Sequence, residues 1–280
     1  KDMTARSGGS TRYNVGQESL SAVPITIAPT LNEQCKIAGF VGIMDAKITQ
    51  LERKKALVED YKKGCMQQLF SQTIRFKDDD GKDFPDWKER QLGDIGEVRT
   101  SSVDKLSREG EKSVGLLNYM DVYRRDHIKD TDSFQTVTAP EGQIVVASLR
   151  EGDVLFTPSS ETPTDIGHSA VVMENLPSVL FSYHLVRFRP SLGLLVPLFS
   201  GYAFKSHKFY LELWKRAQGA TRYTLSKSAL EESIVSIPHP EEQRKIASFL
   251  SALDQKINLV EQELTRARSF KKGLLQQMFL

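Results

Sequence analysis

The sequence predicts an α+β fold in which one mixed α/β domain is flanked by two long helices that form an antiparallel coiled coil. The first observation is an internal repeat, because the helical segment at 32–70 recurs at 241–280. The second is that apolar residues in both copies recur every three or four positions, as they do in paired helices. The third is that short apolar runs bounded by glycine and proline, a pattern typical of strands, lie between the copies.

The two copies match residue by residue. Matching residues recur at a constant spacing: Lys36 with Lys245, Asp45 with Asp254, and Lys62-Lys63-Gly64 with Lys271-Lys272-Gly273. With a shift of one position, Thr11-Arg12-Tyr13 recurs as Thr221-Arg222-Tyr223. In a solenoid each repeat contacts the next one, and two copies this far apart do not. We interpret them as equivalent elements on either side of one different domain.

The first copy begins after an extended segment. Pro24 and Pro29 exclude a helix at 22–29 and permit only an edge strand or a linker there. We expect Asn32 to cap the following helix, with Glu33 in its first turn. Lys55 interrupts an apolar stripe that is otherwise formed by Ile37, Val41, Met44, Ile48, Leu51, Val58, Tyr61, Cys65 and Leu69.

The second copy has a more regular stripe. Its apolar residues step four and three without a break, from Ile246 through Leu250, Leu253, Ile257, Val260 and Leu264 to Ala267, and Phe270, Leu274 and Met278 continue it. Such a seam with charged flanks needs a partner helix, and the first copy is the natural one. The connecting domain must begin and end near opposite helix ends, which favours antiparallel pairing. In the alternative, each helix packs on a globular domain of its own.

The middle of the chain reads as a linker followed by a globular domain. Residues 71–84 are hydrophilic, with a turn signal at Asp80-Gly81. In the domain, at 85–240, we expect a helix over 206–218 with its apolar side chains inward, and a short helix capped by Ser226. The predicted strands are 143–148, 154–157, 170–173, 179–181, 185–188 and 234–237.

Composition excludes few classes of function, but it indicates in which compartment the protein works. The 280 residues carry 38 basic and 36 acidic side chains, so the net charge of +2 does not by itself indicate a nucleic-acid-binding protein. We expect Cys35 and Cys65 to be buried thiols in a reducing cytosol. No apolar run reaches the roughly 20 residues that cross a bilayer. The chain starts at Lys1 inside a repeat, so we expect it to be part of a longer protein.

Motifs that would indicate catalysis are missing from the sequence. It has no Gly-rich dinucleotide or P-loop motif and no paired His or Cys with metal-ligand spacing. The five histidines are scattered, and we expect each to be a surface or structural residue. An enzyme would need a pocket for a cofactor or metal that these residues do not suggest.

A polar loop at 157–168 is the first candidate binding element. Its Ser159, Ser160, Glu161 and Thr162 follow a predicted strand. Hydroxyl groups contact either base edges or phosphates, and a carboxylate accepts a hydrogen bond from cytosine N4. The alternative is an ordinary solvated surface loop.

Three other stretches contain residues suited to nucleic acid. A polar and aromatic pair precedes two arginines in the group Asn118, Tyr119, Arg124 and Arg125. Lys205 and Lys208 flank the start of a predicted helix and are suited to phosphate contacts. Arg222 and Tyr223 belong to the repeated triplet. They either contact a phosphate of the nucleic acid or form structural hydrogen bonds where the domain meets the helix. For the first group the alternative is ordinary surface charge.

Several motifs carry a family resemblance. They are the stretches Gln218-Gly219-Ala220-Thr221-Arg222-Tyr223, Ile237-Pro238-His239-Pro240-Glu241-Glu242-Gln243, Trp87-Lys88-Glu89-Arg90-Gln91-Leu92 and Gly152-Asp153-Val154-Leu155-Phe156-Thr157. With them the chain resembles the specificity (S) subunit of a type I restriction-modification system. The first copy departs from the pattern, since Ala28-Pro29-Thr30 lacks the second proline.

The resemblance implies a domain plan. Residues 1–31 would be the remnant of a first target-recognition domain, 32–70 the central conserved helix, 71–84 a linker, 85–240 a complete target-recognition domain, and 241–280 the C-terminal conserved helix. Such a subunit reads one half of a bipartite site in double-stranded DNA, while its helices set the half-site spacing.

The resemblance also implies partners. The subunit itself performs no chemistry and binds no cofactor. Methyltransferase (M) subunits bring S-adenosylmethionine, and nuclease-translocase (R) subunits join for restriction. A homodimer of the fragment would restore two half-sites, and the setting would be cytoplasmic. The alternative from the residues alone is a coiled-coil scaffold whose middle domain binds protein.

Overall fold

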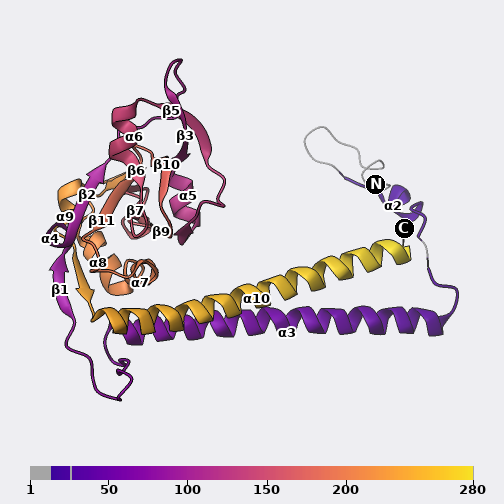
Figure 1. The fold of residues 1–280 in the computed structure, drawn as a ribbon. Coiled ribbons are helices and arrows are strands. Elements are labelled where there is room, and N and C mark those ends of the chain that lie inside the picture. Colours follow the sequence, from indigo (N-terminus) through magenta and orange to yellow (C-terminus); the bar gives the residue numbers. More distant parts are fainter. Residues whose placement is uncertain (1–13, 26, 280) are drawn as a thin grey trace. The chain divides into compact units, whose positions relative to one another are not determined.

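The computed structural model describes residues 14–25 and 27–279 (Figure 1). The chain divides into unit 1, residues 1–58 with 256–280, and unit 2, residues 59–255. Both long helices cross the division, because α3 spans Leu31–Phe70 and α10 spans Pro240–Phe279. The predicted fold class, a mixed α/β domain with two long antiparallel helices, is confirmed. The triplet Thr11-Arg12-Tyr13 lies outside the described residues.

In unit 1 the two long helices pair antiparallel. Leu51 of α3 is buried against Val260 and Leu264 of α10. Ion pairs flank this seam and show the direction, because their residue numbers rise along one helix and fall along the other: Asp45 with Lys271, Glu52 with Arg268, and Lys55 with Glu261. The same sense continues in unit 2, where Lys62 Nζ lies 2.5 Å from Asp254 Oδ1.

The observed seam differs from the predicted apolar stripe, because lysines occupy some of its positions. Tyr61 and Phe270 are exposed and do not belong to it. Lys62 and Lys271, one residue later, are partly buried in their places, and Lys55 continues the stripe instead of interrupting it. A lysine fits a seam position because its methylene stem covers apolar surface while its ammonium group reaches a carboxylate on the facing helix.

The start of α3 also differs from the prediction. Thr30, not Asn32, caps the helix, because its Oγ1 accepts a hydrogen bond from Glu33 N at 3.2 Å. Before it the chain forms the short helix α2 (Gln17–Ser21), and no strand occurs in the described part of 14–30. Cys35 is exposed, so the prediction of two buried thiols holds for Cys65 alone. An early position on a helix without a local partner leaves the Cys35 side chain in solvent.

Unit 2 contains a central five-stranded sheet in the order β2-β11-β7-β9-β4. Its strands are β2 (Gly96–Thr100), β11 (Val186–Pro190), β7 (Val154–Phe156), β9 (Ser169–Val172) and β4 (His127–Ile128). All neighbours pair antiparallel except β4 and β9, which are parallel.

A second sheet has four strands in the order β5-β3-β10-β6. They are β5 (Gln135–Ala139), β3 (Lys112–Leu117), β10 (Leu176–Phe181) and β6 (Ser148–Leu149). Two short antiparallel pairs complete the unit: β1 (Lys88–Gln91) with β13 (Ile234–Ile237), and β8 (Ser159–Ser160) with β12 (Tyr223–Thr224).

Short helices connect these strands. They are α4 (Leu92–Ile95), α5 (Tyr119–Arg124), α6 (Glu141–Ala147), the 3-10 turn η1 (Pro163–Asp165), α7 (Pro197–Ala203), α8 (His207–Arg216) and α9 (Lys227–Glu231). The predicted cap of α9 is confirmed, because Ser226 Oγ accepts from Ala229 N. Ser206 caps α8 in the same way, because its Oγ accepts from Phe209 N. No helix in the described part of the chain is long and apolar enough to span a membrane.

The five-stranded sheet is covered on both faces, as the alternating side chains of β7 show. Val154 and Phe156 of β7 pack with Phe199, Phe204 and the first turns of α10 in one buried cluster. Leu155, which points the other way, packs with the four-stranded sheet in a second cluster. Because both faces are covered, β7 and β9 are buried at every position.

One predicted strand is a helix. Residues 143–148 are rich in β-branched side chains, yet α6 (Glu141–Ala147) occupies most of the segment. Pro140 precedes the first turn with a φ of −70° that suits a helix start, and Glu141 follows it. Val145 and Val146 are exposed, so the segment has only one buried face and burial does not require a strand. The other predicted strands are confirmed, with boundaries that shift by at most three residues.

The start of α10 is anchored in unit 2 by two buried polar residues. The Glu242 carboxylate, which is 0 % exposed, accepts hydrogen bonds from Arg75 Nη2 at 2.8 Å and Trp87 Nε1 at 3.0 Å. Gln243, also 0 % exposed, accepts from Val196 N at 2.8 Å and donates to Leu194 O and Pro238 O. The helix therefore begins inside the domain and not on its surface.

Candidate nucleic-acid interface

The polar loop at 157–168 stands on a closed base. Thr157 N donates to His168 O at 2.9 Å, and Gly167 N donates to Thr157 O at 3.0 Å. Above this closure Ser159 and Ser160 form β8, which pairs with β12. The tip at 161–164 is exposed. The loop therefore presents hydroxyl and carboxylate groups on a backbone that the rest of unit 2 holds in place.

Gly167 is required where the loop returns to the sheet. Its φ is +80°, a conformation that L side chains rarely adopt. A Cβ at this position would lie 2.2 Å from Leu213 Cδ1 on α8. Both the backbone conformation and the close approach of α8 demand glycine, so α8 supports the loop directly.

Predicted residues from three distant stretches meet at this loop. Tyr119 Oη donates to Ser159 O at 2.8 Å, and Arg222 Nη2 lies 3.4 Å from Ser159 Oγ. Within the loop, Ser160 Oγ donates to Thr162 O at 2.5 Å. Burial raises the pKa of Tyr119, which keeps its hydroxyl a hydrogen-bond donor. The pairing of β8 with β12 adds Tyr223 to the same group.

An aromatic pair beside the loop was not predicted. The Tyr123 and His168 ring centroids lie 4.4 Å apart. Between them Asp165 Oδ1 lies 2.8 Å from His168 Nε2 and accepts from Tyr123 Oη at 3.3 Å. The negative charge of Asp165 raises the pKa of Tyr123. The only sequence signal was that Tyr123 follows Tyr119 by one helical turn, which places both on the same face of α5.

Other predicted residues have partners within unit 2. Lys205 pairs with Asp126, and Lys208 Nζ lies 2.6 Å from Glu89 Oε1. Arg125, which directly follows α5, pairs with Asp121 of that helix at 3.2 Å.

The remaining two predicted residues lie on α5 or just before it. Asn118 precedes the helix, and its side-chain amide donates to Gln135 Oε1 at 3.0 Å. Arg124 is exposed in its last turn. Of the predicted group, the structure thus brings together Tyr119, the residues of the loop, Arg222 and Tyr223, and engages the others mainly in intramolecular bonds.

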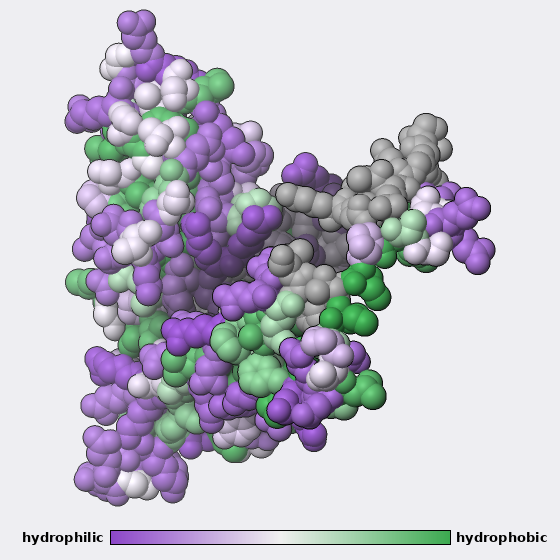
Figure 2. Space-filling view, turned by 90° about the vertical axis from the view of Figure 1, so that its right-hand side faces the viewer, coloured by the Kyte–Doolittle hydropathy of each residue, from purple (hydrophilic) through white to green (hydrophobic). Residues whose placement is uncertain are grey.

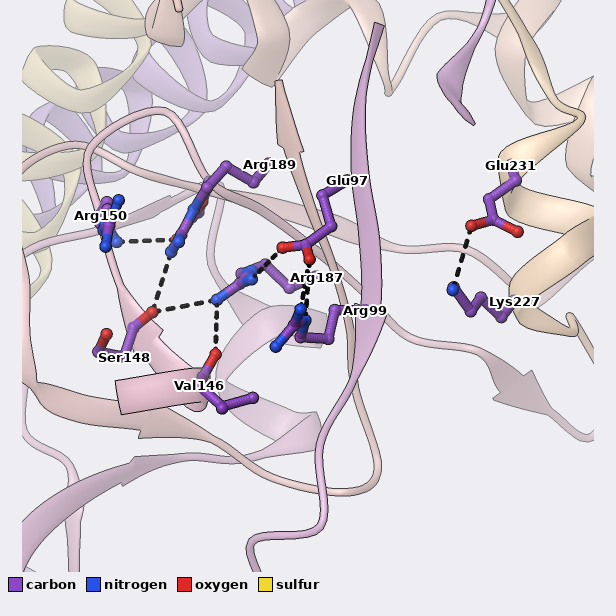
Figure 3. Close-up of polar contacts among 10 residues, drawn as sticks. Glu97, Arg99, Val146, Ser148, Arg150, Arg187, Arg189, Lys227 and Glu231 are labelled. Carbon is purple, nitrogen blue, oxygen red and sulfur yellow. Dashed lines mark hydrogen bonds and ion pairs between the residues drawn. The ribbon is translucent and has the colours of Figure 1, made fainter. Parts of the chain in front are cut away.

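Two further arginines form hydrogen bonds and ion pairs inside unit 2. Arg187, which is 1 % exposed, donates to the carbonyls of Val146 and Ser148 and reaches Glu97 Oε2 at 2.9 Å (Figure 3). Arg189 binds Asp153 through two bonds of 2.6 and 2.7 Å. These contacts hold β11 to the segment around α6 and β6, so these two cations support the fold and do not face a ligand.

The surface around the loop is polar. Figure 2 shows that hydrophilic side chains dominate the face to which α5 belongs, with only scattered apolar residues. Among the described residues no group of three or more His, Cys, Asp or Glu side chains is placed to hold a metal ion. The arrangement is suited to hydrogen bonding and charge contacts over a surface.

Comparison with known proteins relates the chain to one family. Residues 85–267 match the family model described as the type I restriction modification DNA specificity domain. The type I restriction enzyme MjaVIII specificity subunit of Methanocaldococcus jannaschii is 24% identical over 257 residues, which are 88% of this chain and 59% of that protein. The MjaIX specificity subunit of the same organism is 29% identical over 194 residues, 67% of this chain and 43% of that protein. The chain thus spans about half the length of these curated relatives.

Solved structures share the fold. A chain from a study of complex assembly and conformational transition of the type I R-M system aligns with a TM-score of 0.60 and 20% identity, covering 96% of this chain and 63% of that one. The type I restriction-modification S subunit from M. genitalium aligns with a TM-score of 0.57 and 17% identity, covering 99% and 68%. At these identities the likeness concerns the arrangement of helices and sheets.

Proposed function

Because the chain belongs to the family of type I restriction-modification DNA specificity domains, we propose that unit 2 recognises a specific sequence in double-stranded DNA. The observation that carries the proposal is the exposed tip of the loop at 157–168 on its closed base. Base recognition needs donors and acceptors in fixed positions, because a group that must first be ordered loses part of the binding free energy.

The proposed contacts follow from the chemistry of each group. Glu161 at the tip accepts from a cytosine amino group, and Thr162 contacts a base through its hydroxyl or its methyl group. Arg222, at the edge of the loop, contacts the phosphate backbone and sets the register. Tyr119 holds the loop through Ser159 and acts indirectly. This role is binding without catalysis, and any methylation or cleavage belongs to partner subunits.

The helix pair is proposed to dock the methyltransferase subunits. Phe40, Ile43 and Leu57 of α3 are exposed, and so are Leu259 and Phe270 of α10. On α3 these residues fall one position before seam residues, so they form a second apolar stripe beside the buried one. A helix with an exposed apolar stripe is suited to receive a further helix.

The same helices are proposed to set the distance between two half-sites. Each helix has 40 residues. At about 1.5 Å per residue that is about 60 Å, or roughly 18 base pairs of about 3.4 Å. A separation of more than one turn of DNA suits two recognition bodies that each occupy a major groove. The exposed start of α3, which repeats the anchored start of α10, is the proposed seat of the second body.

Selection of preferred duplexes from a random pool tests the function. The chain, reconstituted with its methyltransferase subunits, should enrich one bipartite sequence. Glu161→Gln should relax the preference at one base pair, at a cost of about 1–3 kcal/mol for the preferred site. Glu151→Gln, an exposed residue outside the loop, is the matched control and should change nothing. A complex that forms with the methyltransferase subunits but enriches no sequence would favour a protein-binding scaffold.

A further inference from the structure

The short helix α5 lies beside the polar loop and is bonded to it along one face. Tyr119 and Tyr123 share this face, because they are one helical turn apart. Tyr119 Oη donates to Ser159 O at 2.8 Å, near the start of the loop, and Tyr123 Oη donates to Asp165 Oδ1 at 3.3 Å, near its end. The helix therefore has a fixed place next to the loop that is proposed to read bases.

Contacts on two other sides hold the backbone of α5. Asn118 N donates to Asp121 Oδ2 at 2.8 Å, which closes the first turn, and Asn118 Nδ2 donates to Gln135 Oε1 of β5 at 3.0 Å. Val122, which is 1 % exposed, packs in the buried cluster that also contains Leu155 of β7. A side chain on the remaining face is thus carried by an ordered backbone, so less conformational entropy is lost when it binds a ligand.

Met120 and Arg124 occupy the remaining, outward face of α5. Each is two positions from the buried Val122, which turns it by about 200° around the helix axis and away from the core. Met120 is 44 % exposed, and Arg124 is exposed as well. The two residues are one helical turn apart, so this face carries one apolar group and one cation side by side.

Arg124 differs from the cations near it. Arg125 pairs with Asp121, and Lys205 pairs with Asp126. Among the residues that the structure describes, no carboxylate pairs with Arg124. Its guanidinium donors are therefore available to a molecule outside the chain.

We propose that α5 is a further base-reading element, in which Met120 contacts the 5-methyl group of a thymine and Arg124 binds a guanine in the major groove. The chemistry of each side chain matches its target, since apolar groups pack on the thymine methyl and arginine forms two parallel bonds with guanine O6 and N7. At about 1.5 Å per residue, four residues span about 6 Å, so the two targets lie within two base-pair steps of about 3.4 Å. The inference rests on the proposed function, because the duplex that the polar loop reads brings its groove to α5.

Removal of single methyl groups from the DNA tests the role of Met120. In the duplex that selection identifies as preferred, each thymine is replaced in turn by uracil, which lacks only the 5-methyl group. One replacement should weaken binding of the parent protein about fourfold, the factor that burial of one methyl group contributes. Met120→Ala should bind the unmodified duplex more weakly by about that factor and should not distinguish uracil from thymine there. The matched control is Val145→Ala, an exposed apolar residue on the short helix α6, which should behave like the parent protein at every thymine.

A conservative substitution separates a base contact from a phosphate contact at Arg124. Arg124→Lys keeps the positive charge but loses the planar fork that binds two acceptors. It should weaken binding to the preferred duplex by about fivefold or more, while the slope of log K against log salt concentration stays unchanged. Replacement of one guanine by 7-deazaguanine, which lacks the N7 acceptor, should weaken the parent protein and leave Arg124→Lys unaffected.

Fluorescence anisotropy of the chain reconstituted with its methyltransferase subunits measures these affinities, and only variants whose thermal unfolding matches the parent protein are compared. If no uracil weakens the parent protein, or if Met120→Ala still prefers thymine to uracil, the methyl contact is wrong. If Arg124→Lys binds the preferred duplex as tightly as the parent protein does, Arg124 contacts no base, and that half of the inference is wrong. In both cases the parent protein keeps its selected sequence and the proposed function stands, whereas a parent protein that prefers no sequence would overturn the function itself.

Discussion

Glu242 and Gln243 are buried at the start of α10, whereas their counterparts in the repeat, Glu33 and Gln34, are exposed at the start of α3. Each copy forms a similar local bond, although the acceptor lies five residues before the glutamine in one copy and six in the other. Gln243 Nε2 donates to Pro238 O at 3.0 Å, and Gln34 Nε2 donates to Ala28 O at 2.9 Å. The tertiary bonds differ, because only Glu242 meets an arginine and an indole.

This difference shows that the repeat determines local structure in both copies but does not determine burial. The helix, its first turn and its glutamine bond depend on residues within the repeat, so both copies form them. Burial depends on partners outside the repeat, namely Arg75, Trp87 and Val196. The apolar residues behave in the same way, since Ile246 and Leu250 are fully buried and their counterparts Ile37 and Val41 are only half-buried.

The largest expected effect concerns the acidic pair. Glu242→Ala should lower the free energy of unfolding of unit 2 by about 3–5 kcal/mol, because it removes one side of a buried ion pair. Glu33→Ala, its repeat counterpart, should change the free energy by less than about 0.5 kcal/mol. Urea denaturation of both variants measures the contrast, and equal effects would contradict it.

The glutamine pair should show a smaller contrast. Gln243→Ala leaves Val196 N and Leu194 O without their partner inside the protein, which costs about 2 kcal/mol. Gln34→Ala loses one exposed bond and should cost about 0.5 kcal/mol or less. If denaturation shows a large loss for Gln34→Ala, the start of α3 has a partner that the described residues do not supply.

The ion pairs of the seam allow a further comparison, because the repeat makes one pair in unit 2 equivalent to one pair in unit 1. Lys62 with Asp254 in unit 2 corresponds to Lys271 with Asp45 in unit 1. Asp254 also accepts from Tyr202 Oη at 2.7 Å, and burial with this bond raises the pKa of Tyr202 well above its usual range. Asp254→Asn should cost about 1–2 kcal/mol, and Asp45→Asn less than about 0.5 kcal/mol, in thermal unfolding.

Acid should weaken unit 1 slightly through Glu261, the repeat counterpart of Glu52. The bond to Lys55 lowers the pKa of Glu261, and the charges of Lys55 and Arg268 lower it further. A carboxyl group with a lowered folded-state pKa stabilises the fold above its unfolded pKa, near 4.3, and loses that contribution as pH falls through the folded value. Melting temperature against pH should therefore fall less steeply below about pH 4.5 in Glu261→Gln, and unchanged steepness would refute the role of this pair.

Much of the architecture was predictable. Heptad spacing identified both long helices, because that periodicity is local and repeats over many turns. The domain that connects them favoured antiparallel pairing. The strands at 154–157, 170–173 and 234–237 were predictable because their apolar runs are short and bounded by turn residues. The segment at 143–148 misled the prediction because β-branched residues favour a strand only weakly, and Pro140 and Glu141 start a helix there.

The candidate site was predictable only in pieces. The polar loop and the Thr-Arg-Tyr triplet stood out as separate stretches, and nothing in their spacing placed Arg222 beside Ser159. The contact of Tyr123 with His168 carried almost no signal, because the two residues belong to different segments. Their association depends on pairing between segments that are far apart in the sequence.

The sequence by itself determined which segments become long helices, in which direction they pair and where a compact α/β body must lie, because periodicity and turn chemistry act over a few residues. Only the tertiary structure decided that Glu242 is buried while Glu33 is not, and that Tyr119 and Arg222 both contact Ser159. Burial and electrostatic contact are properties of residues brought together by folding, and a repeat can encode the helix without encoding what packs against it.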